Sequence, residues 1–190
     1  MMKMSDLDRF KASPIPADYP TDRRVFYAPI DDVHGALKTI LEACTKTLVL
    51  SMFGFDDDEL GELIAHHLDN PAIYCQISLD RSQASGVHER EILAKFKAEY
   101  ESNSVAIGNS EHGAIAHRKM LLVEGDMGGI LVTGSTNWSD SGERLQDNEM
   151  TVTLNNRALN AEARHVLDLS HSSMLTQMQA RVASATAKAK

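Results

Sequence analysis

Two continuously apolar runs, each followed by a helical pattern, constrain the fold of this chain more than any other feature. Residues 47–53 (TLVLSMF) and 72–79 (AIYCQISL) are rich in β-forming residues and show no polar alternation, which is typical of strands buried on both faces of a sheet. Apolar residues at helical spacing follow each run, namely Leu60, Leu63, Ile64 and Leu68, and then Ile92, Leu93, Phe96 and Tyr100. This alternation predicts a layered α/β fold with largely parallel strands in this half.

The rest of the chain adds elements at both ends of this pattern. A short apolar run at 25–28 and helical spacing over 33–44 precede it, and residues 105–107 predict another short strand. Residues 117–123 and 130–134 flank a glycine-rich bend and predict a hairpin. A strand at 150–154 and a helix from about 157 to 179 complete the pattern. We therefore expect a mixed, largely parallel sheet flanked by helices.

The length of 190 residues favours one domain with a substantial core. Residues 1–22 contain three prolines and no periodicity, so they predict an extended arm outside the core. Residues 23–180 form the predicted domain, and the low-complexity residues 181–190 are predicted to be disordered. No apolar stretch has the length of a signal peptide or a membrane span. The given sequence therefore predicts a soluble cytoplasmic protein, and export would require a leader outside it.

Charge and cysteine content narrow the range of functions. The chain has 19 Lys and Arg against 27 Asp and Glu, a formal net charge of −8, whereas a protein that binds nucleic acid by diffuse attraction usually has a basic surface. Any chemistry on phosphate must therefore come from a local site. Cys44 and Cys75 lie in apolar runs without metal-ligand spacing, and they predict buried free thiols. The sequence alone leaves a disulfide between them open.

A cluster of His, Lys, Ser and Asn on the predicted hairpin offers such a local site. Residues two apart on a strand project to the same face, so His117 and Lys119 point together while Arg118 points away. An imidazole can act as nucleophile or acid near neutrality, and an ammonium group stabilises a phosphoryl oxygen. Ser135 and Asn137, also two apart, can donate hydrogen bonds to the same anion.

With this pattern the chain resembles the phospholipase D superfamily, whose signature is His-x-Lys, four residues, Asp, and after six more residues Gly-Ser-x-Asn. His117, Lys119, Gly134, Ser135 and Asn137 match it. The likeness extends to residues 25–29, 48–53 and 77–83, covers roughly residues 24–180, and is to the small bacterial nuclease branch.

The chain departs from the signature at the bend of the hairpin. Glu124 stands where the family has Asp, and the hairpin is three residues longer than the family's spacing. Asp126 replaces the motif Asp instead if the bend is bulged. In the family this carboxylate is mainly a structural partner of the motif, so the resemblance puts its local hydrogen bonding in doubt more than the chemistry.

The resemblance implies a phosphodiesterase that works without metal or cofactor, first of all an endonuclease acting on DNA or RNA. The nuclease branch has one signature per chain and assembles its active site across the two-fold axis of a homodimer. His117 would attack the phosphodiester to give a phosphohistidine, while the partner subunit's His117 protonates the leaving oxygen and then activates water. Lys119, Asn137 and Ser135 would stabilise the phosphoryl oxygens. Glu149 matches the acid that orients the catalytic histidine in that branch.

Four further residues are candidates for substrate contact. Ser82 and Gln83 follow a buried strand at its carboxyl end, where α/β sheets place ligands. His112 could line the substrate groove or be an ordinary loop residue. Trp138, the single tryptophan, could stack on a base or fill the core or a dimer interface.

Two other functions remain open at this stage. A phospholipase or cardiolipin hydrolase would use the same constellation, but the sequence shows no hydrophobic anchor or basic amphipathic helix. A nucleic-acid-binding module that has kept the fold and lost turnover is the third hypothesis, although the presence of His117, Lys119 and Asn137 argues against it.

Overall fold

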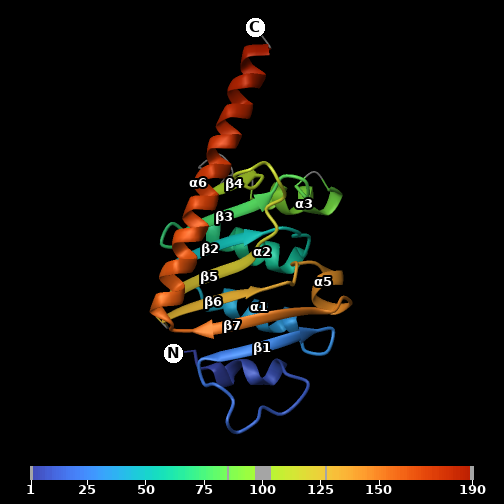
Figure 1. The fold of residues 1–190 in the computed structure, drawn as a ribbon, viewed down its shortest axis with the longest axis vertical. Coiled ribbons are helices and arrows are strands. Elements are labelled where there is room, and N and C mark those ends of the chain that lie inside the picture. The colour runs from blue at the N-terminus through green and yellow to red at the C-terminus, as the bar shows by residue number, and fades with distance from the viewer. Residues whose placement is uncertain (1, 85, 97–103, 127, 189–190) are drawn as a thin grey trace.

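One seven-stranded sheet organises the chain in the computed structural model, which describes residues 2–84, 86–96, 104–126 and 128–188 (Figure 1). The strand order is β1-β7-β6-β5-β2-β3-β4. The strands are β1 (Arg23–Ala28), β2 (Thr47–Met52), β3 (Tyr74–Asp80), β4 (Val105–Gly108), β5 (Lys119–Gly125), β6 (Gly128–Gly134) and β7 (Asn148–Leu154).

The sheet is mixed, and its parallel part is smaller than expected. β2, β3 and β4 pair in parallel, as predicted for this half of the chain. The other four pairs, β1–β7, β7–β6, β6–β5 and β5–β2, are antiparallel. The α/β class and the mixed sheet are thus confirmed, but the largely parallel pairing is confined to three strands. The reason is that β5 and β6 form a tight hairpin and β1 pairs with β7 at the far edge rather than with β2.

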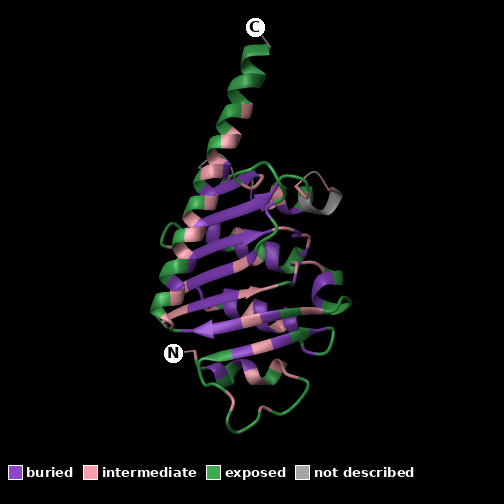
Figure 2. Ribbon diagram, viewed as in Figure 1, coloured by how far each residue is buried: buried purple, intermediate pink, exposed green. Residues whose placement is uncertain are grey.

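Helices cover both faces of the sheet, as Figures 1 and 2 show. The helices α1 (Val33–Glu42) and α2 (Asp58–Leu68) lie on one face, and α6 (Arg157–Lys188) crosses the other. The short α3 (Val87–Lys95) packs beside α2, and α5 (Asp140–Arg144) lies near α1. The predicted helix through Tyr100 extends into residues 97–103, which lie outside the described residues.

The interior strands are buried on both sides, which explains their continuously apolar sequences. Leu121 and Val123 of β5 belong to the main core under α1 and α2. Leu122, between them, packs with Val49 and Leu167 under α6. This alternation is what two covered faces require. Cys44 and Cys75 are buried and free, as predicted.

The N-terminal residues are not an extended arm outside the core, so this prediction is wrong for their first half. Met4–Phe10 form a 3₁₀ helix, η1, that packs against α1. Leu7 is 0% exposed and belongs to the main core. Lys11 then bonds to the buried carboxylate of Asp31, whose other partners are the backbone N–H groups of Ala12 and Tyr27.

The C-terminal residues also differ from the expectation. α6 continues to Lys188 instead of ending near residue 179, and residues 181–188 are therefore helical rather than disordered. Three of its eight residues are Ala, the strongest helix former. Figure 1 shows that this end of α6 projects beyond β4. Among the described residues, no helix combines the length and the apolarity that a membrane crossing needs.

Replacing Leu7 by Ala tests whether the N-terminal segment is part of the core. We expect Leu7→Ala to lower the free energy of unfolding by about 2–5 kcal/mol, because it leaves a cavity in a fully buried site. Urea denaturation measures this change. Leu145→Ala is the matched control, because Leu145 is 69% exposed. Equal stabilities of the two variants would mean that the segment does not pack.

The Asp31 carboxylate makes a pH-dependent contribution to the packing of the N-terminal segment, through its bonds to Lys11 and Ala12. Burial raises its pKa, but Lys11 and the two backbone N–H donors outweigh burial, so that the pKa is lowered overall. A lowered pKa gives stability that is present above the ordinary value and is lost as the pH falls through the folded-state value. We expect Asp31→Asn to lower the free energy of unfolding by roughly 1–3 kcal/mol at neutral pH, and the difference from wild type to shrink below about pH 4.

Urea denaturation at both pH values measures this difference. Asp32→Asn is the control, because Asp32 caps α1 through Gly35 N–H and Asn caps helices equally well. A difference that stays constant with pH would contradict this account.

Candidate active site

The candidate site lies at the edge of the sheet where β2 and β3 end and β5 begins. Met52, the last residue of β2, pairs with Lys119, the first residue of β5. His117 lies two residues before β5, so the predicted strand over 117–123 starts later than expected. Its side chain nevertheless joins that of Lys119, because Lys119 Nζ lies 2.9 Å from His117 Nε2. The predicted pairing of these two groups is therefore present.

This contact defines the chemical state of the imidazole. A lysine ammonium has only hydrogens to offer, so His117 Nε2 must accept and the ring proton, in the neutral form, is on Nδ1. His117 is exposed, whereas Lys119 is 7% exposed. Burial lowers the pKa of Lys119. The site thus presents a nitrogen lone pair beside a partly desolvated cation.

Phe53, which directly follows β2, shapes this pair and was not singled out from the sequence. Its ring lies 4.5 Å from the His117 ring, centroid to centroid, and Lys119 Nζ lies 4.8 Å from the centroid of Phe53. The face of an aromatic ring attracts a cation. Phe53 therefore positions both groups. Its position directly after the buried strand β2 is the sequence feature from which this role could have been predicted.

Asn137 reaches the site from the segment after β6. Gly54 N–H donates to Asn137 Oδ1 at 3.2 Å, which leaves the Nδ2 hydrogens without an acceptor among the described residues. Trp138 N–H donates to the carbonyl oxygen of Gly54, and Phe55 pairs with Trp138 through a parallel bridge. The segments after β2 and after β6 are thus joined by their backbones, and Asn137 is held beside Phe53 and Gly54.

Trp138 does not stack on a substrate base from this position. It is 2% exposed, and its ring packs edge-on against Phe55 with the centroids 5.3 Å apart. The prediction of a substrate contact is therefore wrong, and the alternative of a core residue is confirmed.

Ser135 and Glu149 are engaged at the start of β7 rather than with His117. The Ser135 hydroxyl donates to Asn148 Oδ1 and accepts from Glu149 N–H, each at 3.0 Å. The Glu149 carboxylate accepts from Thr151 at 3.4 Å. In the described part of the chain, the expected hydrogen bond between Glu149 and His117 is absent. Glu149 and Lys119, which bonds to His117, nevertheless line one small cavity.

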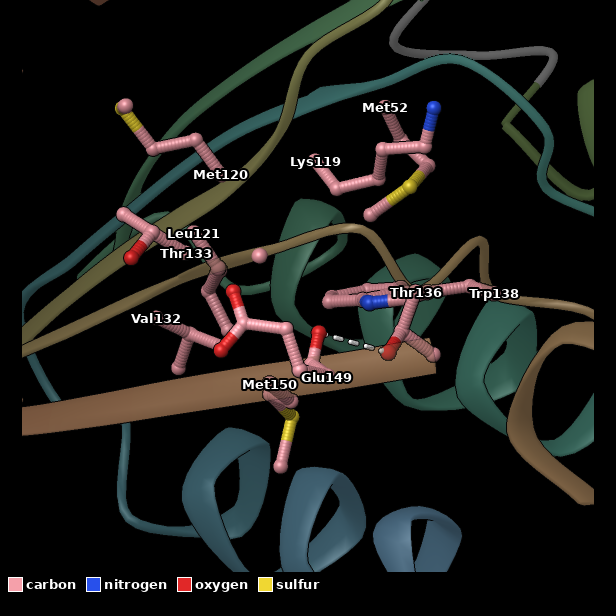
Figure 3. Close-up of a pocket in the computed structure, with 11 residues that line it drawn as sticks. Met52, Lys119, Met120, Leu121, Val132, Thr133, Thr136, Trp138, Glu149 and Met150 are labelled. Atoms are coloured by element: carbon pink, nitrogen blue, oxygen red, sulfur yellow. Dashed lines mark hydrogen bonds between the residues drawn. The ribbon is translucent and has the colours of Figure 1, made fainter. Parts of the chain in front are cut away.

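A small cavity separates Lys119 from Glu149, as Figure 3 shows. Its volume is about 10 Å³, which is close to the space that one water molecule needs, so it does not hold a substrate. Gly134 lines it at a position where no side chain fits. A Cβ atom there would lie 2.2 Å from the carbonyl oxygen of Glu149, and φ is +150°. The glycine of the signature therefore permits close approach of β6 and β7.

Asp80, at the end of β3, ties the segment that carries His117 to the sheet. Its carboxylate is 1% exposed; Oδ2 accepts from Ala116 N–H at 2.5 Å, and Oδ1 accepts from Ser82 N–H and Oγ–H. Ser82 and Ala116, the residue before His117, therefore share the Asp80 carboxylate. Gln83 contacts Ser82 Oγ at 3.3 Å. Asp80 lay within the segment that resembles the family, but its positioning role was missed.

The other predicted residues lie farther from this centre. His112 is exposed in the turn between β4 and β5. Glu124 and Asp126 lie at the opposite end of β5, by the hairpin bend, where Asp126 pairs with Lys46 at 2.8 Å. Whichever of them replaces the motif Asp, neither lies beside His117.

A groove of about 460 Å³ lies next to His117, between residues 109–118 and α6. Ile115 and Leu169, which are 55% and 60% exposed, line it together with Arg118 and Ser173. This groove is large enough for part of a substrate or of another chain.

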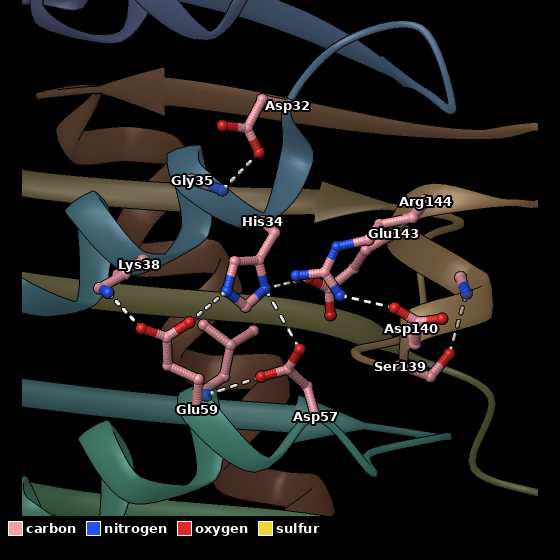
Figure 4. A network of polar contacts seen from close by, with 12 residues as sticks. Asp32, His34, Gly35, Lys38, Asp57, Glu59, Ser139, Asp140, Glu143 and Arg144 are labelled. Carbon is pink, nitrogen blue, oxygen red and sulfur yellow. Dashed lines mark hydrogen bonds and ion pairs between the residues drawn. The ribbon is translucent and has the colours of Figure 1, made fainter.

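Among the described residues, a group of side chains close enough together to hold a metal forms a separate cluster, shown in Figure 4. His34 Nδ1 lies 2.8 Å from Glu143 Oε2 and 3.2 Å from Asp57 Oδ2. Burial lowers the pKa of His34, but its bonds to Glu59 and Glu143 raise it overall. Burial and the charge of Asp57 raise the pKa of Glu143 to about 7.

The comparisons with known proteins agree with this fold. The family described as "Cardiolipin synthase, PLD-like domain" matches residues 37–169. The chain therefore belongs to this family of phospholipase D-like domains. No curated protein sequence matches it.

Three solved structures illustrate the similarity of fold. Nuc, a phospholipase D family member from Salmonella typhimurium, has a TM-score of 0.64 at 16% identity, over 80% of this chain and 94% of that one. NucT from Helicobacter pylori has a TM-score of 0.60 at 14% identity, over 80% of this chain and 96% of that one. Phosphatidylserine synthase from Haemophilus influenzae has a TM-score of 0.58 at 13% identity, over 95% of this chain but 51% of that one.

Replacing Asp80 by Asn tests whether its carboxylate positions the segment before His117. Asn offers one acceptor instead of two, so a buried N–H loses its partner, and we expect the free energy of unfolding to fall by about 1–3 kcal/mol. The amide hydrogen of Ala116 should exchange with solvent faster, which NMR measures. Ser82→Ala is the matched control, because it removes one hydroxyl and leaves Ala116 bonded to Asp80. Unchanged exchange at Ala116 in Asp80→Asn would refute this role.

Proposed function

We propose that the protein is a phosphodiesterase that cleaves DNA or RNA endonucleolytically, with His117 as nucleophile and with no metal in the reaction. The observation that carries this proposal is the contact of Lys119 Nζ with His117 Nε2. It leaves Nε2 unprotonated, as a nucleophile must be, and it places a cation where phosphoryl oxygens would lie.

The proposed mechanism has two displacements at phosphorus. The Nε2 lone pair attacks the phosphodiester, the bond to the leaving oxygen breaks, and a phosphohistidine forms. A water molecule then displaces the histidine and releases the phosphorylated end. Lys119 Nζ and Asn137 Nδ2 donate to the oxygens of phosphorus during both steps, because Gly54 orients the Asn137 amide with its oxygen turned inward.

The first step needs a proton for the leaving oxygen, and we propose that the partner subunit's His117 supplies it in a homodimer. The sequence contains one His-x-Lys motif, so one chain offers one such histidine. The chain spans nearly the whole of Nuc and NucT but about half of phosphatidylserine synthase. The exposed His117 and the adjacent groove with Ile115 and Leu169 give a second copy access to this edge.

A lipid substrate is the second candidate, because the description of the matching family names cardiolipin synthase. The same His117 and Lys119 would then act on a phosphodiester in a headgroup. The resemblance of the sequence to the small nuclease branch makes nucleic acid our first choice. Binding of nucleic acid without cleavage is the third outcome to be tested.

Incubation with DNA, RNA and cardiolipin vesicles in EDTA separates these functions. We expect cleavage of nucleic acid that persists in EDTA and that falls at least about 1,000-fold in His117→Asn. His165→Asn, which changes an exposed histidine of α6, is the matched control and should retain full activity. Loss of cleavage in EDTA without a fall in Tm would refute the metal-free mechanism, cleavage of lipid alone would refute the nuclease, and binding alone would identify an inactive module.

A mixing experiment tests the shared site. If each site needs two copies of His117, a heterodimer of wild type and His117→Asn is inactive, and activity follows the square of the wild-type fraction. An equal mixture, co-refolded so that subunits exchange, should then have about one quarter of the wild-type activity. A value near one half, or an active monomer by light scattering, would contradict the shared site.

A further inference from the structure

A second polar cluster, outside the proposed active site, joins three segments that are far apart in the sequence. His34 lies in the first turn of α1, Asp57 caps α2, and Glu143 belongs to α5. One nitrogen, His34 Nδ1, faces both Glu143 Oε2 at 2.8 Å and Asp57 Oδ2 at 3.2 Å. Figure 4 shows the three side chains pointing toward one another. The cluster is nearly closed to solvent, because His34, Asp57 and Glu143 are 9%, 7% and 1% exposed.

The other ring nitrogen of His34 is already engaged. Nε2 lies 2.8 Å from Glu59 Oε2, and Lys38 pairs with the same carboxylate. Because a carboxylate accepts, Nε2 carries a proton, and Nδ1, which faces two further carboxylate oxygens, must carry either a second proton or a metal ion. Three electron-rich atoms therefore converge at one buried point, an arrangement that requires a positive charge between them.

Glu143 supplies a second observation that points to a ligand here. Its Oε1 atom is buried and has no hydrogen-bond partner, although the residue is 1% exposed. Buried carboxylate oxygens normally have a partner, because leaving one without costs its full desolvation energy. The nearby Arg144 pairs with Asp140 at 2.8 Å.

We propose that His34, Asp57 and Glu143 bind a divalent transition-metal ion, with zinc as the best match. One imidazole and two carboxylates are ligands that zinc takes, and a fourth position is left for water or for Glu143 Oε1. Neighbouring ligand atoms of a tetrahedral zinc site are about 3.4 Å apart. His34 Nδ1 lies 2.8 Å and 3.2 Å from the two carboxylate oxygens, which is near this spacing, and all three atoms lie within 4.8 Å of one another.

Glu59 completes the expected surroundings. A histidine that binds a metal usually donates its second N–H to a carboxylate, which fixes the ring and strengthens the ligand. The contact of His34 Nε2 with Glu59 has this arrangement.

The ion would connect the two segments that hold Asn137. Asp57 and Asp56 bond through their N–H groups to the carbonyl oxygen of Trp138, and Gly142 packs against the carbonyl oxygen of Asn137. The role of the metal is therefore structural. It stabilises the wall behind Asn137 and takes no part in the displacement at phosphorus.

Metal titration of chelator-treated full-length protein tests the proposal without measuring hydrolysis, so its failure is distinct from failure of the proposed function. We expect one zinc per chain by calorimetry, a rise in Tm of about 5–10 °C when zinc is about 100 times above Kd, and the visible absorption of tetrahedral cobalt when Co²⁺ is used instead. Glu143→Gln keeps the shape and removes the charge, and its zinc affinity should fall at least about 100-fold.

Two further variants separate this site from adventitious binding at the surface. Glu59→Gln should weaken zinc binding by about 10–100-fold without abolishing it, whereas His165→Asn should bind as wild type does. If Glu143→Gln does not fold, anomalous diffraction from a cobalt-soaked crystal locates the ion directly. Absence of binding, an unchanged Tm response in folded Glu143→Gln, or a cobalt peak away from His34 Nδ1 would overturn the proposal. In that case protons alone hold this cluster together.

Discussion

The antiparallel pairing of β2 with β5 is the constraint on which the rest of the structure depends. It joins the parallel strands β2, β3 and β4 to the antiparallel strands β5, β6, β7 and β1. Its register sets Met52 opposite Lys119, so the residue after β2, Phe53, meets the residues before β5. A shift of one residue would turn Lys119 to the α6 face and Leu122 to the α1 face. The two apolar clusters on these faces exclude such a shift, and core packing thereby fixes the position of the lysine.

The precision of the site comes from neighbours of the reactive groups rather than from the groups themselves. His117 lies outside the strand, where backbone pairing does not hold it. Asp80 holds the preceding Ala116 N–H, and Phe53 packs against the ring. Asn137 also lies outside a strand and is oriented by Gly54 N–H. The groups that position His117 and Asn137 therefore lie at or just after the ends of β2 and β3. These are the strands with the most continuous apolar sequences.

The sequence was sufficient to predict the features that depend on local patterns. Continuous apolar runs placed β2 and β3, and the spacing of two residues paired His117 with Lys119. Periodicity shows which face of an element is buried but not which strand lies beside it, so the pairing of β1 with β7 was not predictable. η1 buries only Met4 and Leu7, too few residues for a periodic signal. The hydrogen bond expected between Glu149 and His117 was implied by the resemblance alone, and Glu149 bonds to Thr151 instead. The proposed ligand set of His34, Asp57 and Glu143 has no spacing that a motif could show.

The acidic composition has a different meaning once the partners of the carboxylates are known. Residues 56–59 form the densest acidic run, and they follow the strand that ends at the site. Asp57 faces His34, Asp58 pairs with Lys95 at 2.8 Å, and Glu59 bonds to both His34 and Lys38. These charges are compensated locally.

Charges farther away than about 8–10 Å are largely screened at physiological ionic strength. A phosphodiester that approaches His117 therefore meets Lys119 and the exposed Arg118 more than the formal charge of −8. Affinity for a polyanion then depends on a few local contacts, and its dependence on salt should reflect that small number.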